Sequence, residues 1–121
     1  MERRSKIIPA ILAKSENEFR DKLRVIEDVA PLVHIDVMDD TFVRNTTWAD
    51  PLVVEKMKTP ARFEVHLMVE EPFREAILWG KLTGVQRTIV HVEATRQLRE
   101  LLHTIHATGK EAGLAVNPGT P

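Results

Sequence analysis

The feature that most constrains the fold of this chain is a regular alternation between two hydrophobic periods. Short β-branched runs, apolar at every second position, are followed by stretches in which apolar residues recur with helical spacing. The alternation repeats along the chain about every 25 to 30 residues, which is typical of βα units with parallel strands. We predict strands at 6–13, 33–38, 63–69, 87–93 and 112–116, and helices at 15–30, 51–59, 72–83 and 95–108.

These elements predict a single α/β domain over residues 1–121, with about four and a half βα units. A closed barrel of eight such units typically takes about 250 residues, so we expect a partial TIM barrel. Either the sheet stays open or another copy of the chain completes it. Exposed strand edges predict a homodimer. The chain stops after a strand and its turn, which suggests a truncated gene or a designed fragment.

Composition excludes several classes of protein. The formal net charge of −1 gives no reason to expect nucleic acid or an anionic membrane as a partner. No cysteine occurs, so disulfides and thiolate metal sites are excluded. No apolar run approaches the roughly 20 residues of a membrane span, and no signal-peptide core follows the N-terminus. We therefore predict a cytoplasmic protein.

Two of the predicted strands carry the same unusual pattern of polar residues. VHIDVMDD (33–40) places His34, Asp36 and Met38 on one face, and FEVHLMV (63–69) places Glu64, His66 and Met68 on one face. Burying an unpaired charge is costly, so polar groups repeated on one face indicate a shared ligand or a polar network.

Five motifs follow one another along the chain: PAILA, HIDVMD followed by FV-x-N, VHLMVEEP, HVEA and GLAVNPGTP. Their order is that found in the ribulose-phosphate 3-epimerases, and the whole chain resembles that family. The resemblance implies a (β/α)8 barrel that interconverts ribulose 5-phosphate and xylulose 5-phosphate in the pentose phosphate pathway. It also implies a divalent metal at the barrel mouth, with a ketose phosphate as substrate.

The same resemblance assigns roles to individual residues. His34, Asp36 and His66 correspond to metal ligands, and Asp36 also corresponds to an acid/base carboxylate. Met38, Met68 and Asn45 correspond to positions around the substrate. Two imidazoles and a carboxylate suit Zn, Fe(II), Mn or Co. Epimerisation next to a ketone needs a base, a Lewis acid for the enediolate oxygens, and an acid on the opposite face.

The chain departs from the family pattern at several points. Ala10 replaces a serine, Asp40 replaces a glycine and Arg44 replaces a proline. No residue corresponds to the family's seventh strand, with its fourth ligand and opposing carboxylate, or to its late Gly-rich phosphate loops. Under this interpretation the chain is either an epimerase whose site a second subunit completes, or a catalytically inactive half-barrel that self-associates.

Several polar residues also have a structural interpretation. Met38 and Met68 can fill a core. We expect His91 and Glu93 to form structural hydrogen bonds, and Glu64 to be structural or a partner of His66. Lys14 and Arg44 could contact phosphate, although solvated surface charges are the simpler interpretation. Trp48 could belong to a lid or to a partner contact.

Overall fold

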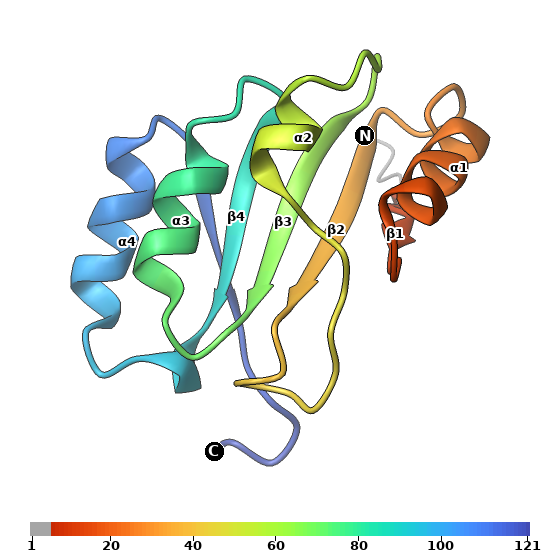
Figure 1. Ribbon diagram of the computed structural model, residues 1–121. Helices are drawn as coiled ribbons and strands as arrows, with labels where there is room; N and C mark the ends of the chain where they lie inside the picture. Colours follow the sequence, from red (N-terminus) through yellow and green to blue (C-terminus); the bar gives the residue numbers. More distant parts are fainter. Residues whose placement is uncertain (1–5) are drawn as a thin grey trace, which may run out of the picture.

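The computed structural model describes residues 6–121, which contain a five-stranded parallel sheet in the order β1-β2-β3-β4-β5 (Figure 1). In doubly wound sheets the strand order reverses at a switch point, whereas an unbroken sequential order is that of a (β/α) barrel. The predicted α/β fold, a partial TIM barrel, is therefore confirmed. The strands are β1 (Ala10–Ile11), β2 (Leu32–Met38), β3 (Arg62–Met68), β4 (Val85–His91) and β5 (Glu111–Ala115).

Each connection between strands carries a helix. The helices are α1 (Glu16–Ile26), α2 (Pro51–Glu55), α3 (Pro72–Gly80) and α4 (Leu98–Ala107), with a 3-10 helix η1 (Val92–Ala94) before α4. Helices α2, α3 and α4 lie on the same side of the sheet (Figure 1). We call the opposite side of the sheet the inner face, because it would line the interior of a closed barrel.

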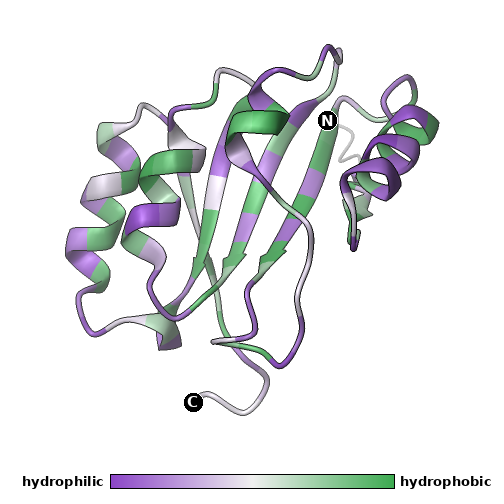
Figure 2. Ribbon diagram, viewed as in Figure 1, coloured by the Kyte–Doolittle hydropathy of each residue, from purple (hydrophilic) through white to green (hydrophobic). Residues whose placement is uncertain are grey.

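The strands are amphipathic in the sense that their two faces meet different surroundings. Green and purple bands alternate along β2 and β3 in Figure 2. Val33, Ile35 and Val37 are 0%, 1% and 7% exposed and belong to the core beneath the helices. The residues between them therefore point to the inner face, where the polar pattern seen in the sequence is gathered.

Side-chain caps start the first two helices. Ser15 Oγ accepts a hydrogen bond from the Glu18 N–H at 3.1 Å, whereas the Glu18 side chain pairs with Lys22 at 3.0 Å. The spacing of Ser15 and Glu18 is that of a capping box, and only the half made by Ser15 is formed. The Asp50 carboxylate accepts from the N–H groups of Leu52 and Val53, with Pro51 at the first helical position, as the Asp-Pro pair predicts.

Several elements are shorter than predicted. Only Ala10 and Ile11 pair in the strand expected over 6–13, next to a proline that lacks an N–H. Helix α2 ends at Glu55 instead of residue 59, because the residue before Pro60 is disfavoured in the helical conformation. Helix α4 begins at Leu98 instead of residue 95, since the 3-10 turn and a hydrogen bond from the Gln97 N–H to Thr95 Oγ1 precede it.

The remaining boundaries shift by a few residues. Strand β4 starts at Val85 and ends at His91, so Glu93 lies beyond the strand, in η1, instead of beside His91 on the strand as expected. Within residues 6–121 no helix combines the length and apolar character needed to cross a bilayer. The expectation about an N-terminal signal depends partly on residues 1–5, which lie outside the described residues.

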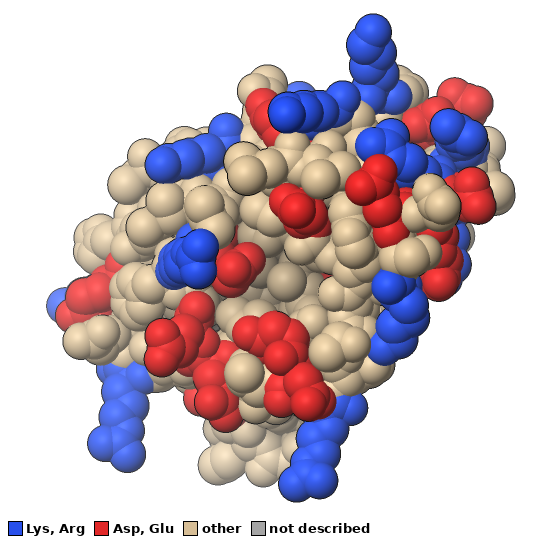
Figure 3. Space-filling model, in the orientation of Figure 1, with Lys and Arg blue, Asp and Glu red and all other residues tan. Residues whose placement is uncertain are grey.

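One group of carboxylates lies at the carboxyl ends of the central strands. Figure 3 shows Asp and Glu side chains gathered on the lower part of the helix-covered face, toward which the arrowheads of β2, β3 and β4 point in Figure 1. In the sequence, Asp39 and Asp40 directly follow β2, and Glu70 and Glu71 follow β3 after one residue. The rim at the carboxyl ends of these strands is therefore acidic.

Candidate metal centre

The inner face is organised in rows that run across the strands. One row joins His34, Glu64, Arg87 and Glu111, which are successive register partners from β2 to β5. The next row toward the carboxyl ends pairs Asp36 with His66, and the one after it pairs Met38 with Met68. Because the register of parallel strands fixes these neighbours, the two polar motifs of the sequence lie directly side by side.

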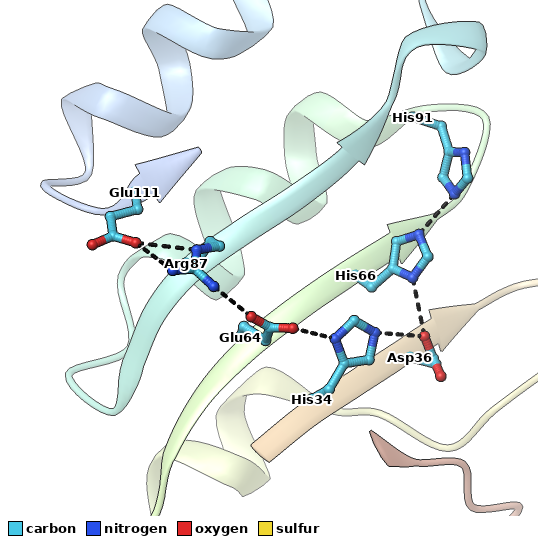
Figure 4. A network of polar contacts seen from close by, with 7 residues as sticks. All are labelled: His34, Asp36, Glu64, His66, Arg87, His91 and Glu111. Carbon is cyan, nitrogen blue, oxygen red and sulfur yellow. Dashed lines mark hydrogen bonds and ion pairs between the residues drawn. The ribbon is translucent and has the colours of Figure 1, made fainter. Parts of the chain in front are cut away.

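Three ligand-type atoms converge between the first two rows. Asp36 Oδ1 lies 3.0 Å from His34 Nε2 and 3.1 Å from His66 Nδ1. The donor atoms of the three residues lie within 4.8 Å of one another. Their side chains are only 18%, 12% and 18% exposed for His34, Asp36 and His66, respectively. Figure 4 shows the three side chains pointing toward one another.

The electrostatics of this cluster favour an ionised carboxylate. Burial alone would raise the pKa of Asp36, but hydrogen bonds with His34 and His66 outweigh it and hold the pKa well below its usual range. The hydrogen bond to Asp36 raises the pKa of His34 against the opposing effect of burial, and Glu64 adds to the increase. Asp36 is thus an anion at neutral pH, between two imidazoles.

Each histidine is also held from its far side. Glu64 Oε2 lies 2.5 Å from His34 Nδ1. Of the two roles expected for Glu64, structural or partner of His66, the second is therefore wrong, because its histidine partner is His34. His66 Nε2 lies 2.7 Å from His91 Nε2, with the two rings stacked at a centroid distance of 4.8 Å. Burial and the nearby His66 lower the pKa of His91.

The cluster fits a divalent metal. With Nδ1 of His34 donating to Glu64, its Nε2 is directed at the shared Asp36 oxygen, which is the carboxylate–histidine arrangement that orients metal ligands. Two imidazole nitrogens and one carboxylate oxygen form a donor set suited to Zn, Fe(II), Mn or Co. His34, Asp36 and His66 are therefore the residues that could hold such an ion.

The positions expected around a substrate are distributed unevenly. Met38 and Met68 lie opposite each other at the carboxyl ends of β2 and β3, and Met68 is 8% exposed. Asn45 instead lies on the loop after β2, where its Oδ1 accepts hydrogen bonds from Lys14 Nζ and from the Thr46 N–H. Lys14 is thus engaged by this loop, since its Nζ also contacts the Thr46 carbonyl.

The loop after β2 is fixed at further points. Asp40, where the family has glycine, adopts a left-handed φ of 68°, which glycine takes without cost and aspartate tolerates better than most residues. The Trp48 ring lies 5.3 Å from the Phe19 ring and packs against the core, and the Trp48 backbone N–H donates to the Ala13 carbonyl. Phe42 lies over His91, with ring centroids 4.8 Å apart.

Sequence reasoning missed the ion pairs beyond Glu64. Arg87 Nη1 donates to Glu64 Oε1 at 2.7 Å, and its Nε and Nη2 donate to Glu111 Oε2 at 3.0 and 2.8 Å. The constant offset of 30 residues between the two polar motifs could have placed Glu64 opposite His34. No such signal marks Arg87, because a register irregularity between Phe63 and Glu64 shifts β4 relative to β3.

Comparison with known proteins identifies the family. The sequence model of the "Ribulose-phosphate 3 epimerase family" matches residues 6–121. Ribulose-phosphate 3-epimerase of Bacillus subtilis is 37% identical over 119 residues, which are 96% of this chain and 54% of that protein.

Two further relatives have the same name. The protein of Rhodobacter capsulatus is 37% identical over 99% of this chain and 53% of its own length, and that of Chlamydia muridarum is 38% identical over 94% and 50%. The chain thus spans about half the length of the curated relatives it matches. The resemblance seen in the motifs is confirmed: this chain belongs to the ribulose-phosphate 3-epimerase family.

Proposed function

We propose that this chain carries the metal-binding half of a ribulose-phosphate 3-epimerase site, for the interconversion of ribulose 5-phosphate and xylulose 5-phosphate. The observation that carries the proposal is the convergence of His34 Nε2, Asp36 Oδ1 and His66 Nδ1 within 4.8 Å in a chain of this family. When bound there, a divalent cation would stabilise negative charge on the substrate oxygens.

Asp36 is the residue best placed to move a proton. Its Oδ1 is shared by two imidazoles, whereas its Oδ2 accepts no hydrogen bond from residues 6–121. The lowered pKa of Asp36 keeps the carboxylate ionised, so Oδ2 can accept the proton from C3 of the ketose phosphate. Met38 and Met68, at the next row, provide an apolar wall that excludes water from the reacting carbon.

Epimerisation needs a second acid on the opposite face of the substrate. We propose that it comes from outside the described half-barrel, through a homodimer formed at the exposed edges of β1 and β5. The acidic rim after β2 and β3 does not favour the phosphate group, which we expect to bind on the opposite side of the mouth. A cytoplasmic location stays a prediction.

The alternative is a catalytically inactive half-barrel that keeps the cluster of His34, Asp36 and His66 but does not epimerise the sugar phosphate. The observation that favours this second candidate is the Arg87–Glu64–His34 network, since it satisfies the buried charge of Glu64 without any ion. The two functions differ in one observable, the exchange of the C3 proton of the substrate with solvent.

The experiment is deuterium incorporation at C3 of ribulose 5-phosphate in D2O, followed by NMR with metal-loaded protein. We expect exchange, which Asp36→Asn abolishes and Asp21→Asn, a change on the exposed surface of α1, leaves intact. Accumulation of xylulose 5-phosphate would show that an oligomer supplies the second acid, and exchange alone would show that this chain performs half of the reaction. No exchange would contradict the enzymatic proposal and leave the inactive half-barrel.

A further inference from the structure

The first row of the inner face forms one continuous polar chain from an edge strand to the metal centre. Figure 4 shows the contacts running from Glu111 on β5 through Arg87 and Glu64 to His34 and Asp36. Each neighbouring pair in the row from Glu111 to His34 is also a register pair of the sheet. The backbone ladder therefore fixes the spacing of these side chains, so the contacts do not depend on a flexible loop.

Glu64 depends on Arg87 because it is almost completely removed from water. The Glu64 side chain is 8% exposed, and each of its oxygens has a different partner, Arg87 Nη1 at 2.7 Å and His34 Nδ1 at 2.5 Å. A buried carboxylate without a fixed cation is strongly destabilised. Arg87 therefore keeps Glu64 in the one orientation in which Oε2 meets His34.

Arg87 is itself held in place by a second carboxylate. Its Nε and Nη2 both donate to Glu111 Oε2, which leaves Nη1 directed at Glu64. The guanidinium group is planar and rigid, so fixing one edge of the fork fixes the direction of the remaining N–H. A lysine at this position would keep the charge and lose this direction.

We propose that Arg87, held by Glu111, is a positioning residue for the metal ligand His34. It acts through Glu64, which keeps the His34 ring oriented with Nε2 facing Asp36. This inference depends on the proposed metal site. It also makes the metal affinity depend on the attachment of the edge strand β5, which contributes Glu111 to the row.

The test compares Co(II) binding to the wild-type chain, Arg87→Met and Arg62→Met. Arg62 is the matched control, because it is an arginine on the adjacent strand β3 whose side chain makes one hydrogen bond within residues 6–121, to the Thr83 carbonyl. Loss of an outer partner of a metal-binding histidine typically weakens binding about 10- to 100-fold. We expect roughly tenfold weaker Co(II) binding in Arg87→Met, and an altered visible absorption spectrum of the bound Co(II).

Two further variants separate positioning from folding. Arg87→Lys should bind Co(II) more tightly than Arg87→Met but less tightly than the wild type, because lysine restores the charge beside Glu64 without the planar guanidinium that fixes the direction of the hydrogen bond. Glu111→Gln changes a side chain that is 59% exposed, so we expect this variant to fold. It tests the same chain of contacts if Arg87→Met does not fold. We expect Glu111→Gln to weaken Co(II) binding less than Arg87→Met does.

A readout without metal completes the test. The hydrogen-bonded Nδ1–H of His34 should give a downfield proton resonance in the metal-free protein, identified by its loss in His34→Gln. Arg87→Met should shift or remove this resonance, and Arg62→Met should not. A wild type that binds no Co(II) would overturn the proposed metal site. Unchanged affinity, spectrum and resonance in Arg87→Met and Glu111→Gln, in a wild type that binds Co(II), would overturn the positioning role alone.

Discussion

Single buried polar atoms differ in how well they are satisfied. Most polar side chains of the inner face have partners. On the opposite side of the sheet, within the described residues, Thr88 Oγ1 is fully buried and makes no hydrogen bond. Thr88 lies on β4 with its side chain in the packed layer beneath the helices, since Arg87 and Ile89 on either side are register partners of inner-face residues. A buried hydroxyl without a partner costs free energy that an apolar group of the same shape does not.

Thr88→Val should therefore stabilise the protein. We expect the free energy of unfolding to rise by about 1 kcal/mol, measured by urea denaturation. The matched control is Thr47→Val, because Thr47 Oγ1 donates to the Asp36 carbonyl and accepts from the Met38 N–H. That change should instead destabilise the protein by about 1–3 kcal/mol. A loss of stability in Thr88→Val would show that its hydroxyl has a partner.

At the scale of elements, α3 and α4 meet closely at a glycine. A Cβ atom added to Gly80 would lie 2.6 to 2.8 Å from Thr108 Oγ1, Cγ2 and Cβ. These atoms belong to the C-cap of α4, so relieving the clash would require the end of that helix to move. The contact at Gly80 thus sets how closely α3 approaches the end of α4.

Gly80→Ala should destabilise the protein by about 1–3 kcal/mol, as overpacking usually does. Combining Gly80→Ala with Thr108→Gly should cost less than the sum of the two single changes, because the second removes the obstructing atoms. Gly84→Ala is the control, since its nearest neighbour would be Phe63 Cδ2 at an ordinary 3.6 Å. Thermal unfolding of the four variants checks this, and additive effects would contradict the proposed contact.

The turn after β5 is attached to η1 by one carboxylate. Hydrogen bonds from the Thr120 side chain and the Asn117 N–H, the latter at 2.8 Å, lower the pKa of Glu93 to about 2. A group whose pKa is lower in the folded protein stabilises that state above its unfolded pKa, and this contribution is lost as the pH falls. The attachment should therefore weaken between about pH 4.5 and pH 2.

Amide exchange at Asn117 measures this attachment. We expect protection of the Asn117 N–H, corrected for the intrinsic rate, to decrease as the pH falls through this window. In Glu93→Gln the protection should be low and independent of pH over the same range. Equal pH dependence in the wild type and the variant would assign the effect to another group.

At the scale of the whole molecule, the sequence predicted the order of elements because hydrophobic period is a local property. It also predicted which residues of 33–38 and 63–69 share a face. It did not predict that β1 has two paired residues, since strand length depends on the neighbouring strand. Nor did it predict the ion pairs of Arg87, because they depend on the register between β3 and β4.

The open ends of the sheet make a prediction about assembly. Within the described residues 6–121, strands β1 and β5 each pair on one side only, and Leu114 on β5 and Val116 just after it are 51% and 55% exposed. We expect a dimer in sedimentation equilibrium, and a shift toward monomer in Leu114→Lys/Val116→Lys. Leu52→Lys, a change at a 72% exposed position on α2, should not alter the mass. A monomeric wild type would count against the proposed dimer.

The metal content of the purified chain tests the central claim most directly. After loading with Zn and removal of free ions, we expect about one ion per wild-type chain, and a much lower content in His66→Ala, which loses one of the three converging ligands. His103→Ala, on the exposed side of α4, should bind as the wild type does. The same zinc content in His66→Ala and in the wild type would contradict the assignment of His34, Asp36 and His66 as a metal centre.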